Sequence, residues 1–323
     1  MKKWFSCLSA VLALVASLGA APASAQDYPA RPVSLVVGFA PGGNADIVAR
    51  LVAQRLGDAL GQQVVVENRG GAGGMLASEN VARSAPDGYR LLLVSGAFPA
   101  QAAVLPRLPF DPVRDFTPVS MLIAYPLVVS VPADSPFRTL DDLVKHARAN
   151  PRKLNYPSPG NGSLFHLATE FFGSVAGVEM THVPFKGGSQ PMTELLAGRL
   201  DVMFDTLSVV QPQFQAGKLR ALAVTSPRRM PQLPAVPTVA ESFPGYEAGS
   251  FLAIAGPAGM PPAVVERLNG AVRRVLNQPD VRQRFTELGG EGVGGSPADM
   301  AAQITTAIDR WKAIVRARDI KAE

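Results

Sequence analysis

The groups in this chain best placed to do chemistry are backbone amides in two glycine-rich turns. Residues 39–46 read FAPGGNAD and residues 69–74 read RGGAGG, and each turn separates an apolar run from a helix-like segment. The first N–H groups of a helix have no partner within it, and they attract anions. The turns therefore predict a site for a small carboxylate, although glycine turns can also serve only to bend the chain.

Polar side chains elsewhere could contribute to the same site. Asp46 falls in the first turn of an expected helix, where it either complements the helix dipole or accepts a hydrogen bond from a ligand. Asp205 follows an expected strand and has the same two interpretations. The turn at 158–163 offers hydroxyls and backbone donors, and His166, just after it, is more typical of capping or packing than of catalysis.

No catalytic constellation accompanies these residues. The three histidines have neither HExxH nor paired spacing, and no G-x-S-x-G motif is present. The turn at 42–43 lacks the Lys-Ser/Thr of a nucleotide phosphate loop, and 70–74 lacks G-x-G-x-x-G spacing. The sequence therefore indicates a binding protein and not an enzyme, with no metal site and no cofactor.

The elements that must position the glycine turns alternate between strand and helix. Apolar periodicity predicts strands and helices, in chain order, at residues 32–39, 46–60, 64–67, 75–83 and 91–94. This alternation is typical of an open α/β sheet, which binds ligands beyond the carboxyl ends of its strands. Both glycine turns and a third turn, Ser95-Gly96-Ala97, lie at those ends, so we expect them to converge on one crevice.

The middle of the chain repeats this alternation of strands and helices. A long β-type run at 121–131, interrupted by Pro126, could carry the chain into a second domain. The expected helices beyond it are 139–150, 164–176, 191–197, 262–276 and 297–318, and the expected strands are 154–156, 180–184, 202–204, 219–224 and 251–255. The sequence thus predicts a second α/β unit followed by a return to the first.

The N-terminus has the anatomy of a secretory signal. Lys2 and Lys3 precede the apolar run 8–18, and the small residues 23–25 precede Gln26. A membrane anchor is the weaker interpretation, because the run is shorter than the ~20 residues that span a bilayer. We expect cleavage between Ala25 and Gln26 and export to the periplasm. Cleavage also removes the only cysteine, so the mature chain should contain no disulfide.

Size and charge narrow the function classes further. The ~300 residues left after cleavage suffice for two domains of ordinary size. The formal net charge of the full chain is +5, and its basic residues are spread over helix faces without interleaved aromatic residues. Such spreading is typical of solvated surface and does not indicate nucleic-acid binding.

With these turns identified, the chain resembles the Bug family of extracytoplasmic solute receptors of tripartite tricarboxylate transporters. The resemblance extends over the mature chain. The stretches that carry it are FAPGGNAD (39–46), VVVENRGGAGG (64–74), APDGY (85–89), SPGNGSLFHLA (158–168), VPFKGG (183–188), MFDTL (203–207), GKLRALAVTS (217–226) and PAVPTVAES (234–242).

The resemblance implies a two-domain periplasmic binding protein of type II-like, flytrap architecture. Residues 26–123 and 252–323 would form domain 1, residues 124–251 would form domain 2, and two crossing strands would act as the hinge. A ligand carboxylate would be held between the domains by loop amides and hydroxyls. The residues implied to bind it are Phe39, Ala40, Pro41, Gly42, Gly43, Asp46, Gly73, Gly74, Ser95, Gly96, Ala97, Ser158, Gly160, Asn161, Ser163, His166, Lys186, Gly187, Asp205 and Thr206.

Departures from the family pattern make the expected site less polar. Ala45, Pro159, Phe185 and Thr206 stand where polar or different residues are frequent, and the loop 96–99 is apolar. We therefore hypothesise a ligand with an apolar or aromatic body and one carboxylate, unlike a citrate-like polyacid. Arg69 and Lys186 could assist in holding it.

The resemblance also implies partners. We expect a monomer that delivers its ligand to the membrane permease subunits of a tripartite transporter. A receptor of the same shape that signals to a sensor kinase is one alternative, and a secreted α/β enzyme acting on small acids is another. A surface adhesin is a third, for which the sequence offers no feature.

Overall fold

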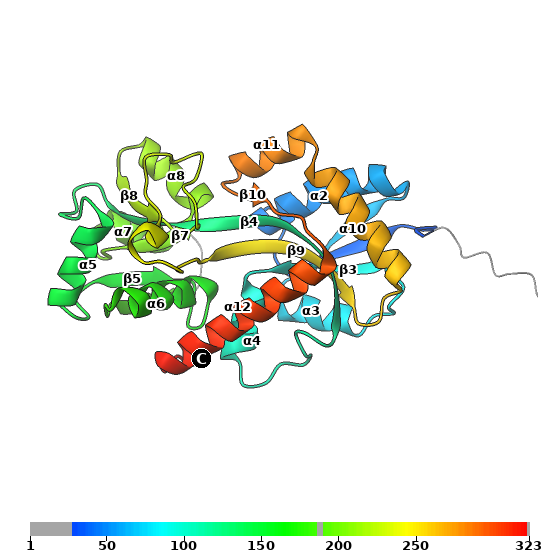
Figure 1. The fold of residues 1–323 in the computed structure, drawn as a ribbon, viewed down its shortest axis with the longest axis horizontal. Coiled ribbons are helices and arrows are strands. Elements are labelled where there is room, and N and C mark those ends of the chain that lie inside the picture. The colour runs from blue at the N-terminus through cyan, green and yellow to red at the C-terminus, as the bar shows by residue number, and fades with distance from the viewer. Residues whose placement is uncertain (1–27, 186–189, 322–323) are drawn as a thin grey trace, which may run out of the picture.

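Two long strands run through the middle of the molecule, and an α/β unit lies at each end of them (Figure 1). The computed structural model describes residues 28–185 and 190–321, and the account below concerns these residues. The central strands are β4 (Phe116–Pro132) and β9 (Gly249–Pro257), which pair antiparallel. The predicted run at 121–131 is thus the middle of a longer strand.

The first unit is a mixed sheet in the order β10-β4-β9-β3-β1-β2. Its other strands are β1 (Val33–Val37), β2 (Val64–Asn68), β3 (Arg90–Ser95) and β10 (Glu291–Gly292). β1 pairs parallel with β2 and β3, whereas β9 pairs antiparallel with β3. The helices of this unit are α2 (Asn44–Leu60), the 3-10 turn η1 (Ala72–Gly74), α3 (Met75–Ala82), α4 (Ala97–Val104), α10 (Pro262–Leu276) and α11 (Pro279–Glu287).

The continuous apolar sequence of β1 follows from burial on both faces of the sheet. Val33, Leu35 and Val37 pack in the cluster that includes residues of α2 and α10. Val36, between them, faces the opposite cluster with residues of α3 and β3. Because alternate side chains of a strand point to opposite faces, only a strand covered on both sides reads as an unbroken apolar run.

The second unit is built on the other end of β4. Residues 127–132 of β4 pair with β7 (Met203–Thr206) and β8 (Leu219–Val224), and β5 (Asn155–Ser158) pairs parallel with β6 (Thr181–Pro184). The helices here are α5 (Leu140–Ala149), α6 (Leu164–Ala176), α7 (Gln190–Leu196), α8 (Leu207–Gln215) and α9 (Val239–Ser242). One strand therefore belongs to both units, and the predicted domain boundaries fall inside β4 and β9.

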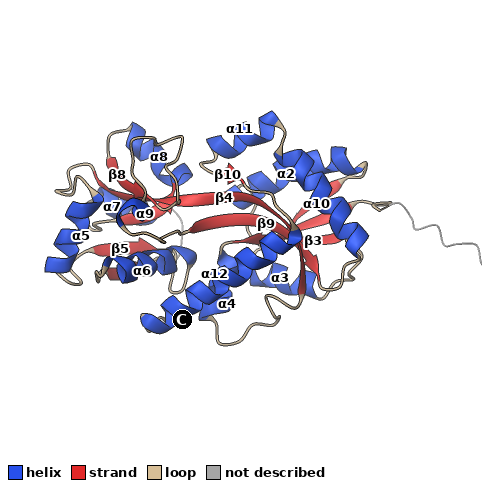
Figure 2. Ribbon diagram, viewed as in Figure 1, coloured by secondary structure: helices blue, strands red, loops and turns tan. Residues whose placement is uncertain are grey.

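The C-terminal helix α12 (Pro297–Ala317) also touches both units (Figure 2). Met300, Ile304 and Ile308 are buried in a cluster with β3 and β9. One to two turns later, Trp311 and Ile314 are buried in the core of the second unit, which includes residues of α6. The end of the chain, which the resemblance placed in domain 1, thus packs against the second unit as well.

Most predicted elements are confirmed, and the missed ones have identifiable causes. Helices α6 and α10 have the predicted bounds. The short α4 was missed because it carries Pro99 and has no side-chain cap, and α8 because Pro212 lies inside it. The sequence analysis also did not anticipate α9 or α11.

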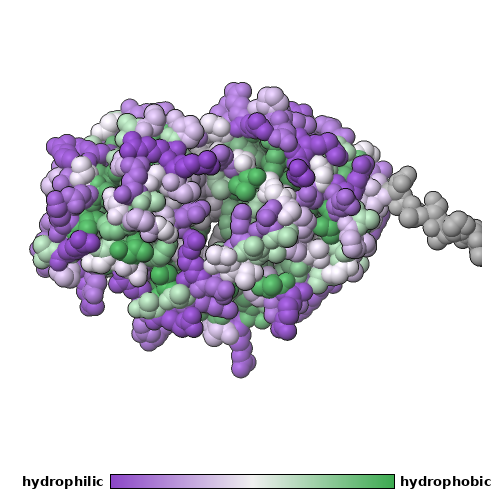
Figure 3. Space-filling model, viewed as in Figure 1, coloured by the Kyte–Doolittle hydropathy of each residue, from purple (hydrophilic) through white to green (hydrophobic). Residues whose placement is uncertain are grey.

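On the face seen in Figure 3, hydrophobic and hydrophilic residues are interspersed. None of the helices in residues 28–185 and 190–321 combines the length and apolar character needed to cross a bilayer. The proposed signal, residues 1–25, lies outside the described residues.

Removing the contact of α12 with the second unit should destabilise the whole protein. Trp311 is 3% exposed, and replacing a buried Trp by Ala typically costs about 3–5 kcal/mol. We expect Trp311→Ala to lower the free energy of unfolding by that amount in urea titrations. Lys312→Ala, its exposed neighbour, is the control and should change it by less than about 0.5 kcal/mol. Equal stability of the two variants would contradict the packing described.

Candidate ligand-binding site

A cavity of about 770 Å³ lies between the two units, where strand ends and helix starts meet. The first unit contributes residues of three segments, at 39–45, 72–75 and 95–105, the last of which contains α4. The second contributes 159–165 and 205–209, and Tyr125 and Leu252 of the central strands also line it. A cavity of this volume is in the range that holds small organic ligands.

Helix N-termini surround this cavity. The first residues of α2 and α6 line it, and so do Ala97 at the start of α4 and Thr206, the N-cap of α8. The N-cap residues Gly43, Gly96 and Thr206 make no side-chain hydrogen bond to their helices, whereas Ser163 caps α6 by accepting from the His166 amide at 3.3 Å. The backbone amides at these helix starts and the positive ends of the helix dipoles therefore favour an anionic group here.

The first glycine turn is fixed by Asp46. The Asp46 carboxylate accepts from the Gly42 amide, from Arg50 Nε and from Asn68 Nδ2, each at 2.9 Å. The side chain is almost fully buried, and the Arg50 hydrogen bond is the main cause that lowers the Asp46 pKa to about 2. Asp46 does not line the cavity; it holds the turn that does.

The second glycine turn lies directly against the first. A Cβ added to Gly38 would be only 2.6 Å from Gly74 Cα, so the two backbones meet where a side chain would separate them. Gln101 of α4 donates to the carbonyls of Ala72 and Gly73 at 3.0 and 3.1 Å. The turn is therefore held by α4 on one side and by the end of β1 on the other.

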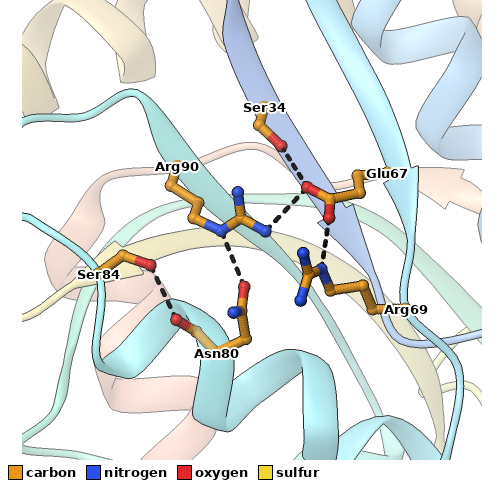
Figure 4. Close-up of polar contacts among 6 residues, drawn as sticks. All are labelled: Ser34, Glu67, Arg69, Asn80, Ser84 and Arg90. Atoms are coloured by element: carbon orange, nitrogen blue, oxygen red, sulfur yellow. Dashed lines mark hydrogen bonds and ion pairs between the residues drawn. The ribbon is translucent and has the colours of Figure 1, made fainter.

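A polar cluster beside this turn engages Arg69 (Figure 4). Glu67, in β2, accepts from Ser34 Oγ at 3.2 Å, from Arg90 at 2.8 Å and from Arg69 Nε. Burial opposes the charge of Glu67, but hydrogen bonding by Arg69 and the charge of Arg90 hold its pKa below the usual value. Arg69, which we considered as an aid to ligand binding, is paired with Glu67 and does not line the cavity.

In the second unit, a histidine pair holds the polar turn. The rings of His166 and His182 stack at 3.8 Å, and His166 Nδ1 accepts from the Gly162 amide at 3.0 Å. Ser158 Oγ lies 2.6 Å from His182 Nε2. Burial lowers the His166 pKa to about 3, with a smaller contribution from His182, and burial lowers the His182 pKa to about 4. His166 therefore positions the turn as a neutral side chain.

Asp205 differs from Asp46 in facing the cavity. One oxygen, Oδ1, accepts from the Thr206 amide at 2.7 Å and lies 3.4 Å from Thr206 Oγ1. Burial raises the Asp205 pKa to about 6. Among the described residues that line the cavity, Asp205 is the only one with a charged side chain.

The structure brings together half of the residues that the resemblance implied. Those that line the cavity are Phe39, Gly43, Gly73, Ser95, Ala97, Gly160, Asn161, Ser163, Asp205 and Thr206. Those that do not line it are Ala40, Pro41, Gly42, Asp46, Gly74, Gly96, Ser158 and His166. Lys186 and Gly187 lie outside the described residues. Several in the second group hold the lining loops.

The residues that sequence reasoning missed are mainly apolar. They include Met75, Val104, Leu105, Tyr125, Phe165, Val209 and Leu252, with Gln101 and Ser250 as polar additions. Tyr125 and Leu252 lie on the predicted crossing strands, and that placement was the available signal for them. Met75 comes from α3 and Ser250 from β9. The others come from α4, α6 and α8 or their ends, whose orientation depends on tertiary packing. Within the described chain, no group of three His, Cys, Asp or Glu side chains could hold a metal ion.

Comparisons with known proteins agree with this arrangement. Residues 48–320 match the family model described as tripartite tricarboxylate transporter family receptor. The chain is 40% identical over 290 residues to a UPF0065 protein from the tcbD-tcbE intergenic region of Pseudomonas sp. strain P51, covering 89% of this chain and 86% of that one. It is 36% identical over 313 residues to protein BugT of Bordetella pertussis, covering 96% of each.

Solved structures share the two-domain fold. Rpa4515 of R. palustris with adipate has a TM-score of 0.79 and 38% identity, covering 91% of this chain and 99% of that one. MatC (Rpa3494) of Rhodopseudomonas palustris with bound malate has a TM-score of 0.74 and 34% identity, covering 89% and 100%. The periplasmic binding protein BugD has a TM-score of 0.75 and 32% identity, covering 92% and 100%.

A methyl group between the glycine turns should destabilise the protein. Gly38→Ala would place Cβ 2.6 Å from Gly74 Cα, and separating two backbones to make room typically costs about 1–3 kcal/mol. Gly70→Ala is the control, because its Cβ would have no atom closer than 3.8 Å. We expect urea titrations to show the loss for Gly38→Ala alone. Unchanged stability of Gly38→Ala would show that the turns are not in contact.

Acid should destabilise the protein through His166. Above pH 6.5 the side chain is neutral in both the folded and the unfolded state. Below pH 6.5 the unfolded chain binds a proton that the folded protein takes up only near pH 3, so stability falls as the pH falls.

The measurement is the free energy of unfolding at pH 7 and pH 4.5 for the native protein and for His166→Asn. Asn keeps an acceptor for the Gly162 amide but does not titrate, so the loss between the two pH values should shrink by up to about 2 kcal/mol. Comparing each protein with itself cancels the contribution of other groups. An equal loss in both proteins would exclude this role of His166.

Proposed function

Because this chain belongs to the tripartite tricarboxylate transporter receptor family, we propose that it is a periplasmic receptor that binds a small organic carboxylate and delivers it to the membrane subunits of such a transporter. The observation that carries this proposal is the cavity of about 770 Å³ into which the N-termini of α2, α4, α6 and α8 converge. Fixed amides and helix dipoles can bind a carboxylate without an arginine.

The ligand that fits this cavity best has an apolar body. Phe39, Met75, Val104, Phe165 and Leu252 are among its walls, and burial of apolar surface favours a hydrocarbon chain or ring between them. Relatives of similar fold hold adipate and malate in their crystal structures. We infer a carboxylate with an aliphatic or aromatic body for this chain, and a polyacid such as citrate fits less well.

The receptor would close around its ligand by movement of its two domains. We propose residues 26–123 with 252–323 as one domain and 124–251 as the other, with β4 and β9 as the hinge strands. The mature protein would begin at Gln26 after signal cleavage and act as a monomer. Its action needs no catalysis, cofactor, metal or nucleic acid, so a bound acid should be released unchanged.

A ligand screen tests this function. Protein purified from the periplasm and stripped of metabolites is melted with benzoate, adipate, malate or citrate. A ligand at 100 times its Kd adds about 2.7 kcal/mol of stability. We expect benzoate or adipate to raise the melting temperature more than citrate, and the acid to be recovered unchanged. Stabilisation by citrate alone would contradict the apolar ligand, and conversion of an acid to product would indicate an enzyme.

A matched pair of variants places the binding in this cavity. Val209 lines it and is 44% exposed, whereas Val113 is 51% exposed and lies outside it. Both positions should therefore accept Asp without unfolding the protein. We expect Val209→Asp to raise the Kd at least tenfold by repelling the carboxylate, and Val113→Asp to leave it unchanged.

A further inference from the structure

A single acidic side chain faces a cavity that is otherwise suited to anions. Asp205 is the last residue but one of β7 and lines the cavity beside Thr206. No Lys, Arg or His side chain lines the cavity in the described part of the chain. Among the described residues, a carboxylate ligand that enters between the helix N-termini therefore meets the charge of Asp205 without a cation to separate them.

The partners of Asp205 do not neutralise it. Oδ1 accepts from the Thr206 amide at 2.7 Å and lies 3.4 Å from Thr206 Oγ1, and Oδ2 has no partner among the described residues. Asp46 makes the contrast: Arg50, Asn68 and the Gly42 amide satisfy its carboxylate, and it does not line the cavity. Of these two aspartates, only Asp205 has a carboxylate oxygen available to a ligand.

The elements packed against β7 bring no compensating charge. On β4, Tyr125 has its hydroxyl 3.4 Å from Asn44 Oδ1. On α6, His166 is a buried acceptor for Gly162, and Glu170 is paired with Arg318 at 3.3 Å. On β5, the Tyr156 hydroxyl donates to Glu170 at 2.5 Å.

The sequence of α8, LSVVQPQFQ, contains no ionisable side chain. None of the titratable groups on these neighbours forms an ion pair with Asp205.

We propose that Asp205 is protonated when the ligand carboxylate is bound, so that the receptor takes up one proton from solvent with each carboxylate it captures. This inference rests on the proposed function. The neutral acid would donate its O–H to a ligand oxygen, a short charge-assisted hydrogen bond, where the ionised form would repel the ligand. Asp205 thus acts as a specificity-determining residue that accepts anions and disfavours ligands presenting an ammonium group in need of a counter-charge.

Binding must then weaken as the pH rises. Burial raises the pKa of free Asp205 to about 6, so about half of the receptors carry the proton at pH 6 and about one in a hundred at pH 8. If only the protonated form binds, the Kd rises about 50-fold between these pH values. Below pH 6 the Kd should level off. The sign is opposite to that of a site in which an ionised aspartate binds the amino group of a ligand.

The test measures binding of benzoate and of adipate by calorimetry at pH 6 and pH 8. At pH 8 the titration is repeated in HEPES and in Tris, whose different ionisation heats report the number of protons taken up. Native protein should show the ~50-fold rise in Kd and nearly one proton bound per ligand at pH 8. Asp205→Asn keeps a hydrogen-bond donor without titrating, so its Kd should differ by less than threefold between the two pH values.

Glu247→Gln is the matched control. Glu247 is an exposed acid of the same unit that does not line the cavity, and the variant removes the same charge. It should keep the pH dependence and the proton uptake of the native protein. Loss of the pH dependence in this variant would overturn the assignment to Asp205, because net charge alone would then explain it.

The remaining outcomes separate the two proposals. Binding of either acid to native protein with a Kd that does not change with pH, or without proton uptake, would overturn this inference and leave the proposed function standing. Loss of binding at both pH values in a folded Asp205→Asn would also overturn it, because the ionised carboxylate would then be required. Failure of native protein to bind either acid at both pH values would overturn the proposed function and this inference together.

Discussion

A binding site made of backbone amides can be shaped only by fixing the backbone, and this constraint governs the structure around the cavity. Each lining turn is held by hydrogen bonds between a side chain and its backbone; of these side chains Asp46 and His166 do not line the cavity, whereas Gln101 does. Asp46 fixes the first glycine turn, Gln101 the second, and His166 the turn of the second unit. These three side chains are therefore occupied with protein groups, and the described surface that they leave for a ligand consists of main chain, apolar walls and a few polar side chains such as Asp205 and Thr206.

The same constraint gives different roles to two aspartates, Asp46 and Asp205, that occupy similar positions in the sequence. Asp46 and Asp205 both follow strands and both precede or begin helices. Three donors surround the first and lower its pKa, whereas burial without a cation raises the pKa of the second. Position in the chain predicted that both would lie near the crevice. The difference in role comes from Arg50 and Asn68, which reach Asp46 and have no counterpart at Asp205.

Much of this fold could be predicted from the sequence, and the family resemblance is confirmed. Continuous apolar runs such as β1 and capped helices such as α6 carry local signals strong enough to fix their bounds. The site was predicted as a set of loops, because glycine turns between strands and helices are visible in one dimension. Its apolar walls were not, because Val104 and Val209 belong to the short helices α4 and α8, whose prolines obscure them. Contact between Gly38 and Gly74 likewise depends on the pairing of distant segments.

The placement of α12 has a mechanical consequence for the molecule as a whole. If only the two connecting strands, β4 and β9, joined the units, one unit could twist as well as bend against the other. The 21-residue helix α12 adds a third connection, because Met300 is buried in the core of the first unit and Trp311 in the core of the second. Twisting of the units about the long axis of the molecule would therefore have to break the packing of α12 against one of them.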